Sequence, residues 1–320
     1  MSPDPDEEQY AAHAPKGSEE TQRTDLPPDI TICIVSWNRA DLLEQCLQSI
    51  YATEQAVTFE VIVVDNASGD SSPDMVSRRF PQVQILVNAD NRGFGRANNQ
   101  AIEIGRGRYF LILNPDTLLM DRTLNNMVAF LEDHPRAAVA TGKVYESDRL
   151  DEVRISYDYN DLTPGFLFRN DLATVGGLHR LFPGNDRIAA WVWGGSDPEL
   201  AQRVSQVTGA FMGVRREAID EVGMFDERYF LYMEETDWCR RFRQAGWEIY
   251  YTPESAIVHI SEGSSQLRTD RNQLYYDSIK LYLHKHFGWS GRLMYQCQEN
   301  LLFGPLRHVR RFLKRIQGGA

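Results

Sequence analysis

Apolar, β-branched runs that end at polar residues recur through the first third of this 320-residue chain. The runs are residues 30–35, 59–64, 83–87 and 109–113. Between them lie three segments with helical periodicity, at 38–51, 74–80 and 96–105. A run that is apolar on both faces is typical of a strand buried in a parallel sheet. Strands that alternate with helices in this way predict a doubly wound α/β sheet with right-handed crossovers.

Polar side chains stand where two of these runs end. Asp65 follows the second run, and Asn114 and Asp116 follow the fourth. Ligands of open α/β sheets bind outside the carboxyl ends of the strands. The pattern therefore predicts a ligand site near these three residues.

Charge and cysteine content exclude several classes of protein. The formal net charge is −11, so we do not expect binding to nucleic acid by bulk electrostatics. The four cysteines are far apart and form no CxxC pair, which argues against a zinc site or a disulfide framework and favours a reducing cytoplasm. No run of about 18 apolar residues is present to span a bilayer. We expect a protein that is soluble or lies on a membrane surface.

Three motifs are candidates for binding a metal or an anion, and each also has a purely structural interpretation. Asn114-Pro115-Asp116 presents oxygen ligands suited to Mg²⁺ or Mn²⁺, or else is an Asx-Pro turn. The Asp65 carboxylate could accept hydrogen bonds from a base or ribose, or else Asp65 merely begins a polar turn. The segment 91–98 contains two glycines and two arginines before a helix, an arrangement that favours anions. It is not the GxGxxG of dinucleotide folds.

Two further motifs lie in the second half of the chain. Glu234, Glu235 and Asp237 fall at a predicted helix start, where acids either complement the helix dipole or deprotonate an acceptor hydroxyl. His259 ends an apolar strand and could complete a metal site if another motif supplies the other ligands.

These segments, in this order, resemble the family-2 glycosyltransferases of the GT-A fold, and especially a bacterial subgroup of rhamnosyltransferases. The similarity covers about residues 30–265 and rests on six lines: TICIVSWNRADLLEQCLQSI, VIVVDNASGD, NADNRGFGRANNQAI, RYFLILNPD, TGAFMGVRREAIDEVGMFDERYFLYMEETDWCRRFRQAGW and IVHISEGSS. The resemblance implies an α/β GT-A sheet, mixed but mainly parallel and flanked by helices, followed by a C-terminal helical extension.

The resemblance also implies a role for each matching residue. The catalytic base would be Glu235 or, second, Asp237, with Glu234 beside them, because the family's usual Glu-Asp pair is Glu-Glu here. Mg²⁺ or Mn²⁺ would be held by Asp116 and His259. Thr208, Gly209 and Ala210 would lie beneath the acceptor. The donor-binding residues would be Ser36, Asn38, Asp65, Asn91, Gly93, Phe94, Asn98 and Asn114.

The implied reaction is a single in-line displacement. It would move one sugar, with inversion, from a nucleotide-diphosphate sugar (dTDP-rhamnose by subgroup) to a hydroxyl of a glycan or lipid-linked glycan. The chain lacks the QxxRW line and the membrane helices of processive synthases. A sugar nucleotidyltransferase and a non-catalytic nucleotide-sugar binder remain as alternatives. A nucleotidyltransferase usually has a glycine-rich, basic first loop, whereas the first loop here, residues 36–39, contains no glycine. A non-catalytic binder is favoured by Asn114 in place of the family's first Asp.

The chain divides into three predicted parts. Residues 1–29 are acidic and polar and predict a disordered arm. Residues 30–265 would be the catalytic domain, with an irregular excursion at 146–205 on the acceptor side. Residues 266–320 would form the helical extension, and its basic amphipathic segment 299–316 would either lie on an anionic membrane at the cytoplasmic face or pack on the domain.

Overall fold

The computed structural model describes residues 26–53, 55–146, 150, 153–154, 156–175, 197–260 and 270–306. Residues 1–25 of the predicted disordered arm lie outside the described residues. Its last residues are ordered, because the Asp29 carboxylate accepts hydrogen bonds from Thr58 and lies 2.7 Å from Arg108.

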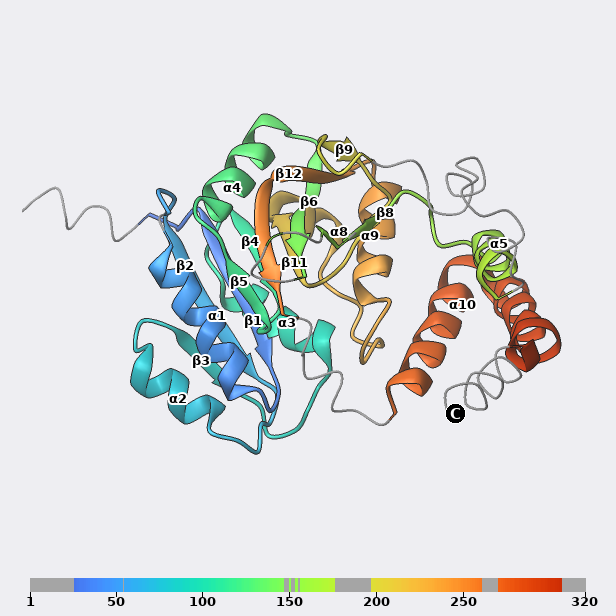
Figure 1. Cartoon of the computed structure of the whole chain (residues 1–320), viewed down its shortest axis with the longest axis horizontal. Helices are drawn as coiled ribbons and strands as arrows, with labels where there is room; N and C mark the ends of the chain where they lie inside the picture. The colour runs from blue at the N-terminus through green and yellow to red at the C-terminus, as the bar shows by residue number, and fades with distance from the viewer. Residues whose placement is uncertain are drawn as a thin grey trace, which may run out of the picture.

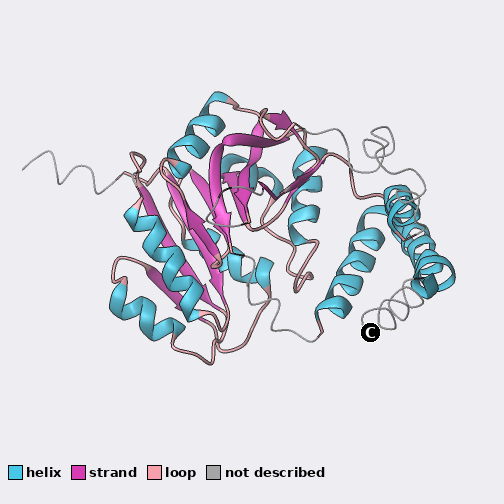
Figure 2. Cartoon of the chain, viewed as in Figure 1, coloured by secondary structure: helices cyan, strands magenta, loops and turns pink. Residues whose placement is uncertain are grey.

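The strands form a mixed, mainly parallel sheet, which confirms the predicted α/β class (Figure 2). Its strands are β1 (Ile30–Ser36), β2 (Phe59–Asp65), β3 (Gln84–Val87), β4 (Tyr109–Leu113), β5 (Thr117–Leu119), β6 (Ala137–Tyr145), β7 (Val153–Arg154), β9 (Gln202–Arg203), β11 (Phe211–Arg215) and β12 (Glu248–His259). The main path runs β3-β2-β1-β4-β11-β6-β12-β5. A separate two-stranded ribbon pairs β8 (Tyr157–Asp158) with β10 (Gln206–Val207).

Helices cover both faces of the sheet, and a further group lies to one side (Figure 1). On one face the core is shared with α1 (Ala40–Ala52), α2 (Ser72–Arg79) and α4 (Thr123–Asp133). On the other it is shared with α3 (Phe94–Ile104), α8 (Arg216–Val222) and α9 (Glu234–Gln244). A third apolar cluster joins α5 (Pro164–Thr174) to α10 (Arg271–Cys297), which continues into a π-helix, η2 (Gln298–Phe303).

Strands β1, β2, β3 and β4 are parallel, so their carboxyl ends meet at one edge of the sheet. Strand β11 runs antiparallel to β4 and pairs Phe211 with Leu113, which brings the residues before β11 to that same edge. Strand β12 pairs His259 with Thr117 at the start of β5. Segments far apart in the sequence therefore converge where β4 ends.

The structure differs from the sequence expectation in three places. The apolar segments 247–251 and 256–259 predict two separate strands, but residues 248–259 form the single strand β12, whose register shifts between Thr252 and Ala256. Within 146–205, predicted to be irregular, α5 is regular and is capped by Thr163, whose side chain accepts from the Phe166 N–H. The amphipathic pattern at 270–287 predicts a helix that ends there, but α10 extends to Cys297 across a kink at Gly288, where φ is +67°.

Candidate active site

A pocket of about 620 Å³ opens at the carboxyl edge of β4. Most of the predicted site residues line it: Asn91, Gly93, Phe94, Asn114, Asp116, Thr208, Gly209, Ala210, Glu234, Glu235 and His259. These residues come from segments that span more than half of the chain. The fold gathers them because the loops after β3, β4 and β12 and the loop before β11 all meet at this edge.

One wall is the glycine loop that precedes α3. Gly93 has φ +85° and lies against the backbone of Phe230, so a Cβ at this position would collide with the Phe230 carbonyl. The Phe94 N–H donates to that same carbonyl at 2.9 Å. Asn66 holds the loop from beneath by donating through Nδ2 to the Gly93 carbonyl at 3.0 Å. Glycine is therefore required here both by the left-handed backbone and by the close approach of a second chain segment.

The segment 208–210 forms a second wall. The Asn114 N–H donates to the Ala210 carbonyl at 3.0 Å, and the Thr208 N–H donates to the Ser156 carbonyl at 2.8 Å. Gly209 faces the Phe94 ring, where a Cβ would lie 3.1 Å from the ring edge. The predicted acceptor loop and the predicted donor residues thus meet within the one pocket.

Asp116 and His259 are brought together at the pocket floor. Asp116 Oδ1 and His259 Nε2 lie 3.1 Å apart, and both side chains are largely buried. The backbone fixes this pairing, because the Ile260 N–H donates to the Asp116 carbonyl at 2.9 Å. Two such ligands fit a Mg²⁺ or Mn²⁺ ion that takes its remaining oxygens from a bound diphosphate and water. In the described part of the chain no cluster of three or more His, Cys, Asp or Glu side chains could hold a metal by itself.

Glu234 and Glu235 begin α9 and face the same pocket. Burial raises the pKa of Glu235, and burial together with the neighbouring Glu235 charge raises the pKa of Glu234 well above its ordinary value. The Oε2 atom of each is buried and has no hydrogen-bond partner among the described residues. A carboxylate with a raised pKa and a free oxygen is suited to accept a proton.

The backbone before these acids is strained. Tyr232 has φ +71° and Met233 φ +70°, left-handed values that are uncommon for side chains of this size. The Asp237 N–H donates to the Met233 carbonyl at 2.8 Å, which helps to hold the turn. Strain of this kind persists where the surrounding structure over-determines it, and it often marks a functional site.

Five predicted site residues do not line the pocket. Ser36, Asp65 and Asn98 are buried. Asp65 accepts from the Ser68 N–H at 2.8 Å, and Asn98 donates to the Phe94 carbonyl at 3.0 Å. Asn38 accepts from the Gly69 N–H at 2.6 Å and thereby ties the loops after β1 and β2. Asn38 and Asp65 thus hold the loops after β1 and β2, and donor binding by these four residues stays a prediction.

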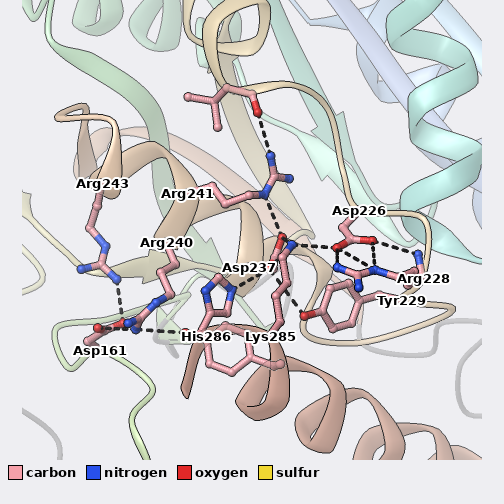
Figure 3. A network of polar contacts seen from close by, with 12 residues as sticks. Asp161, Asp226, Arg228, Tyr229, Asp237, Arg240, Arg241, Arg243, Lys285 and His286 are labelled. Carbon is pink, nitrogen blue, oxygen red and sulfur yellow. Dashed lines mark hydrogen bonds and ion pairs between the residues drawn. The ribbon is translucent and has the colours of Figure 1, made fainter. Parts of the chain in front are cut away.

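Asp237 is the fifth, and its environment explains why (Figure 3). Its side chain is fully buried and lies between three cationic or imidazole groups. His286 Nε2 is 2.7 Å from Oδ1, Lys285 Nζ 2.9 Å from Oδ2 and Arg241 Nε 2.9 Å from Oδ2. Burial alone would raise the pKa of Asp237, but these hydrogen bonds outweigh it and hold the pKa below its ordinary value. A carboxylate so occupied is a poor proton acceptor.

The same network extends from α9 to the C-terminal helix. Lys285 also lies 2.7 Å from Asp226, whose pKa is held low chiefly by the Arg228 guanidinium. One turn further along α9, Arg240 Nη1 donates to Asp161 at 2.6 Å and to the hydroxyl of Tyr282 on α10 at 3.5 Å. Helix α10 is thereby fastened to the helix that carries Glu234 and Glu235.

Several pocket residues were not among the predicted site residues. The pocket is also lined by Trp37, Asn66, Arg154, Phe230, Tyr232, Arg271, Asn272 and Tyr275. Arg271, Asn272 and Tyr275 belong to the first turns of α10, beyond the segments that carried the resemblance. Only tertiary contact brings them to the site, so their spacing in the sequence contained no signal.

Comparison with known proteins assigns the class. The family model described as glycosyl transferase family 2 matches residues 31–223, and the chain belongs to that family. It is therefore a sugar-transferring enzyme.

Named relatives narrow the similarity. The chain is 28% identical over 288 residues to N-acetylglucosaminyl-diphospho-decaprenol L-rhamnosyltransferase of Mycobacterium tuberculosis, covering 83% of this chain and 87% of the relative. It is 24% identical over 247 residues to rhamnosyltransferase WbbL of Escherichia coli, covering 72% and 83%. A solved mannosyltransferase from Pyrobaculum calidifontis, in complex with GDP-Man and Mn²⁺, matches with a TM-score of 0.54 at 18% identity, covering 88% of this chain and 72% of that one. That match supports the GT-A-like fold alone.

Proposed function

We propose that this enzyme transfers a single rhamnose, with inversion, from dTDP-rhamnose to a hydroxyl of a lipid-linked glycan. The observation that carries the proposal is the composition of one pocket. The acid pair Glu234 and Glu235 and the Asp116–His259 pair line the same cavity. A one-step sugar transfer needs an acid group that can accept a proton and ligands that can hold a diphosphate-bound cation.

Glu235 is the proposed base. It is partly exposed, whereas Glu234, which also lines the pocket, is only 3% exposed. Glu235 takes the proton of the acceptor hydroxyl as the hydroxyl oxygen forms a bond to the anomeric carbon. The bond from that carbon to the donor diphosphate breaks, and the nucleoside diphosphate departs. Attack from the face opposite the leaving group inverts the anomeric configuration.

Asp116 and His259 are the proposed holders of Mg²⁺ or Mn²⁺. The ion, when bound, neutralises charge on the departing diphosphate. Asn91, Gly93 and Phe94 form the adjoining wall and would lie against the donor. The acceptor class is suggested by the mycobacterial relative, whose name specifies an N-acetylglucosaminyl-diphospho-lipid.

The test uses dTDP-rhamnose, Mn²⁺ and a short-chain N-acetylglucosaminyl-diphospho-polyprenol. Product is detected by mass spectrometry and its anomeric configuration by NMR. We expect Glu235→Gln to lower the rate by at least about 100-fold, the usual contribution of a positioned base, with dTDP binding unchanged. Glu103→Gln, on an exposed position of α3, is the matched control and should keep full activity.

The alternatives make different predictions in the same experiment. Donor binding without turnover would identify a non-catalytic binder, and pyrophosphate exchange would identify a nucleotidyltransferase. A product of retained configuration would refute the one-step mechanism. Full activity of Glu235→Gln would move the base elsewhere in the pocket.

A further inference from the structure

The outward face of the C-terminal helical segment is apolar. After the kink at Gly288, α10 continues to Cys297 and η2 follows directly. Large apolar side chains are exposed along this stretch, with Trp289 72% and Leu301 73% exposed. We call this face the apolar stripe, and it consists of Trp289, Leu293, Met294, Leu301, Leu302 and Leu306. A row of six exposed large apolar side chains marks an interaction surface in a folded protein.

The spacing shows that the stripe residues of α10 share one face of that helix. Trp289, Leu293 and the exposed Cys297 are four residues apart. Residues four apart lie one above the other on an α-helix. Leu301, Leu302 and Leu306 extend the row of exposed apolar side chains into η2 and the residues after it.

Contacts on the opposite face fix the orientation of the segment. Tyr295 and Phe303 are buried there, and the Phe303 ring packs 5.8 Å from that of Phe168 on α5. Gln298 Nε2 donates to the buried Asp171 carboxylate at 2.8 Å. Because this inward face already has apolar and polar partners, the stripe cannot turn inward without breaking them.

We infer that the apolar stripe docks on the surface of an anionic lipid bilayer. The residues that follow it in the sequence include Arg307, Arg310, Arg311, Lys314 and Arg315, and residues 307–320 contain no acid. Apolar side chains next to a basic cluster are the composition of segments that lie in the interface of anionic membranes. No helix in the described ranges has the length and apolarity to cross a bilayer, so the contact is with its surface.

The distribution of charge favours a bilayer over a second copy of the chain. The whole chain carries −11, so an anionic surface repels most of it and attracts the basic end. That contrast orients the protein with the stripe toward lipid. Parallel pairing of two copies through their stripes would bring like charges together, because Arg307 directly follows Leu306 in each copy.

The stripe and the pocket lie at opposite ends of one helix. Arg271, Asn272 and Tyr275 line the pocket, and Gly288 separates them from the stripe. A helical run from residue 271 to residue 288 spans about 27 Å at 1.5 Å per residue. The pocket-lining end of α10 therefore lies no more than about 27 Å from the start of the stripe. The inference does not depend on which sugar is transferred.

Vesicle sedimentation of the full chain tests it without any activity readout. We expect binding to vesicles of phosphatidylglycerol and phosphatidylcholine, weakened by high salt, and little binding to phosphatidylcholine alone. Leu293→Gln with Leu301→Gln should weaken binding at least about tenfold, since two leucines that lipid would bury are replaced by amides. Val87→Gln with Leu200→Gln is the matched control, because these residues are similarly exposed outside the stripe.

Cys297 provides a second, independent readout. It is the exposed cysteine of the four and lies on the stripe face, so an environment-sensitive fluorophore attached there should shift to the blue on anionic vesicles. Equal sedimentation of the stripe variant and wild type, or no binding of wild type, would overturn the inference. So would light scattering that shows a wild-type dimer dissociated by Leu293→Gln with Leu301→Gln, because the stripe would then be occupied by a second copy.

Discussion

Replacing Asp237 by asparagine would remove the negative charge from the centre of the network in Figure 3 while keeping the shape of the side chain. Asp237 is fully buried, and His286 is 6%, Arg241 19% and Lys285 21% exposed in their side chains. The variant would leave two cations facing a neutral amide in a largely buried place. Lys285 would retain Asp226 as a partner at 2.7 Å.

The expected loss of unfolding free energy is about 2–4 kcal/mol. Removing one partner of a buried ion pair typically costs about 3–5 kcal/mol, and the partial exposure of Arg241 and Lys285 reduces that cost. The loss should also depend on pH. Since the pKa of Asp237 is lowered in the folded state, its contribution is complete above the ordinary value of 3.8 and disappears as the pH falls through the folded pKa. The stability difference between wild type and variant should therefore begin to shrink below about pH 4 and vanish only below the folded pKa of Asp237.

Urea denaturation at pH 7 and at a series of pH values from 4 downward, followed by circular dichroism, measures both effects. Asp277→Asn is the matched control, because Asp277 lies on the same helix α10 in an exposed contact with Lys280 and should cost no more than about 1 kcal/mol. A loss below about 1 kcal/mol for Asp237→Asn at pH 7 would refute the reasoning. A loss that does not shrink as the pH falls through this range would show that the charge of Asp237 is not the source of the stabilisation.

The remaining expectations concern the pocket and the thiols. Gly93→Ala should lower the melting temperature and abolish dTDP binding, because its Cβ would meet the Phe230 carbonyl at a left-handed φ; normal dTDP affinity by calorimetry would contradict this. Mn²⁺ should raise the melting temperature strongly only together with dTDP, and Asp116→Asn should remove that gain; strong stabilisation by Mn²⁺ alone would indicate a complete protein site. Of the four cysteines only Cys297 should react rapidly with a thiol reagent in the native state, since Cys33, Cys46 and Cys239 are buried. Burial also raises the pKa of Cys46 and of Cys239 to about 12. A second rapidly reacting thiol would argue against this packing.

The parallel half of the sheet could be predicted because each of its strands is a local pattern. The apolar runs at 30–35 and 109–113 are buried on both faces, and β1 and β4 form there. The elements between 117 and 145 could not be placed in the same way. β6 is long and buried, yet its stretch mixes alanine, threonine and glycine, and its position depends on pairing with β11 and β12.

The site residues, too, could be predicted where they depend on a local pattern and not where they depend on tertiary contact. Residues at strand ends, such as Asp116 and Gly93, could be found because topology places strand ends together. Asp237 follows Glu235 by two residues, which suggested a shared role. Side chains two residues apart on a helix, however, point in different directions. Asp237 points toward α10 and its cations, while Glu235 faces the pocket. The contribution of α10 could not be predicted, because nothing local in its first turn indicates which cavity it will reach.

Along α10, the residues that fasten the helix and those that face the pocket do not overlap. Lys285 and His286 hold it through Asp237, and Ser278 donates to the Leu231 carbonyl at 2.8 Å. Arg271 and Tyr275, earlier in the helix, line the cavity. Substitutions in the first turns therefore leave the anchoring contacts intact. This short stretch can therefore vary, and change what the pocket presents to a ligand, while Glu234, Glu235 and the glycine loop before α3 stay unchanged.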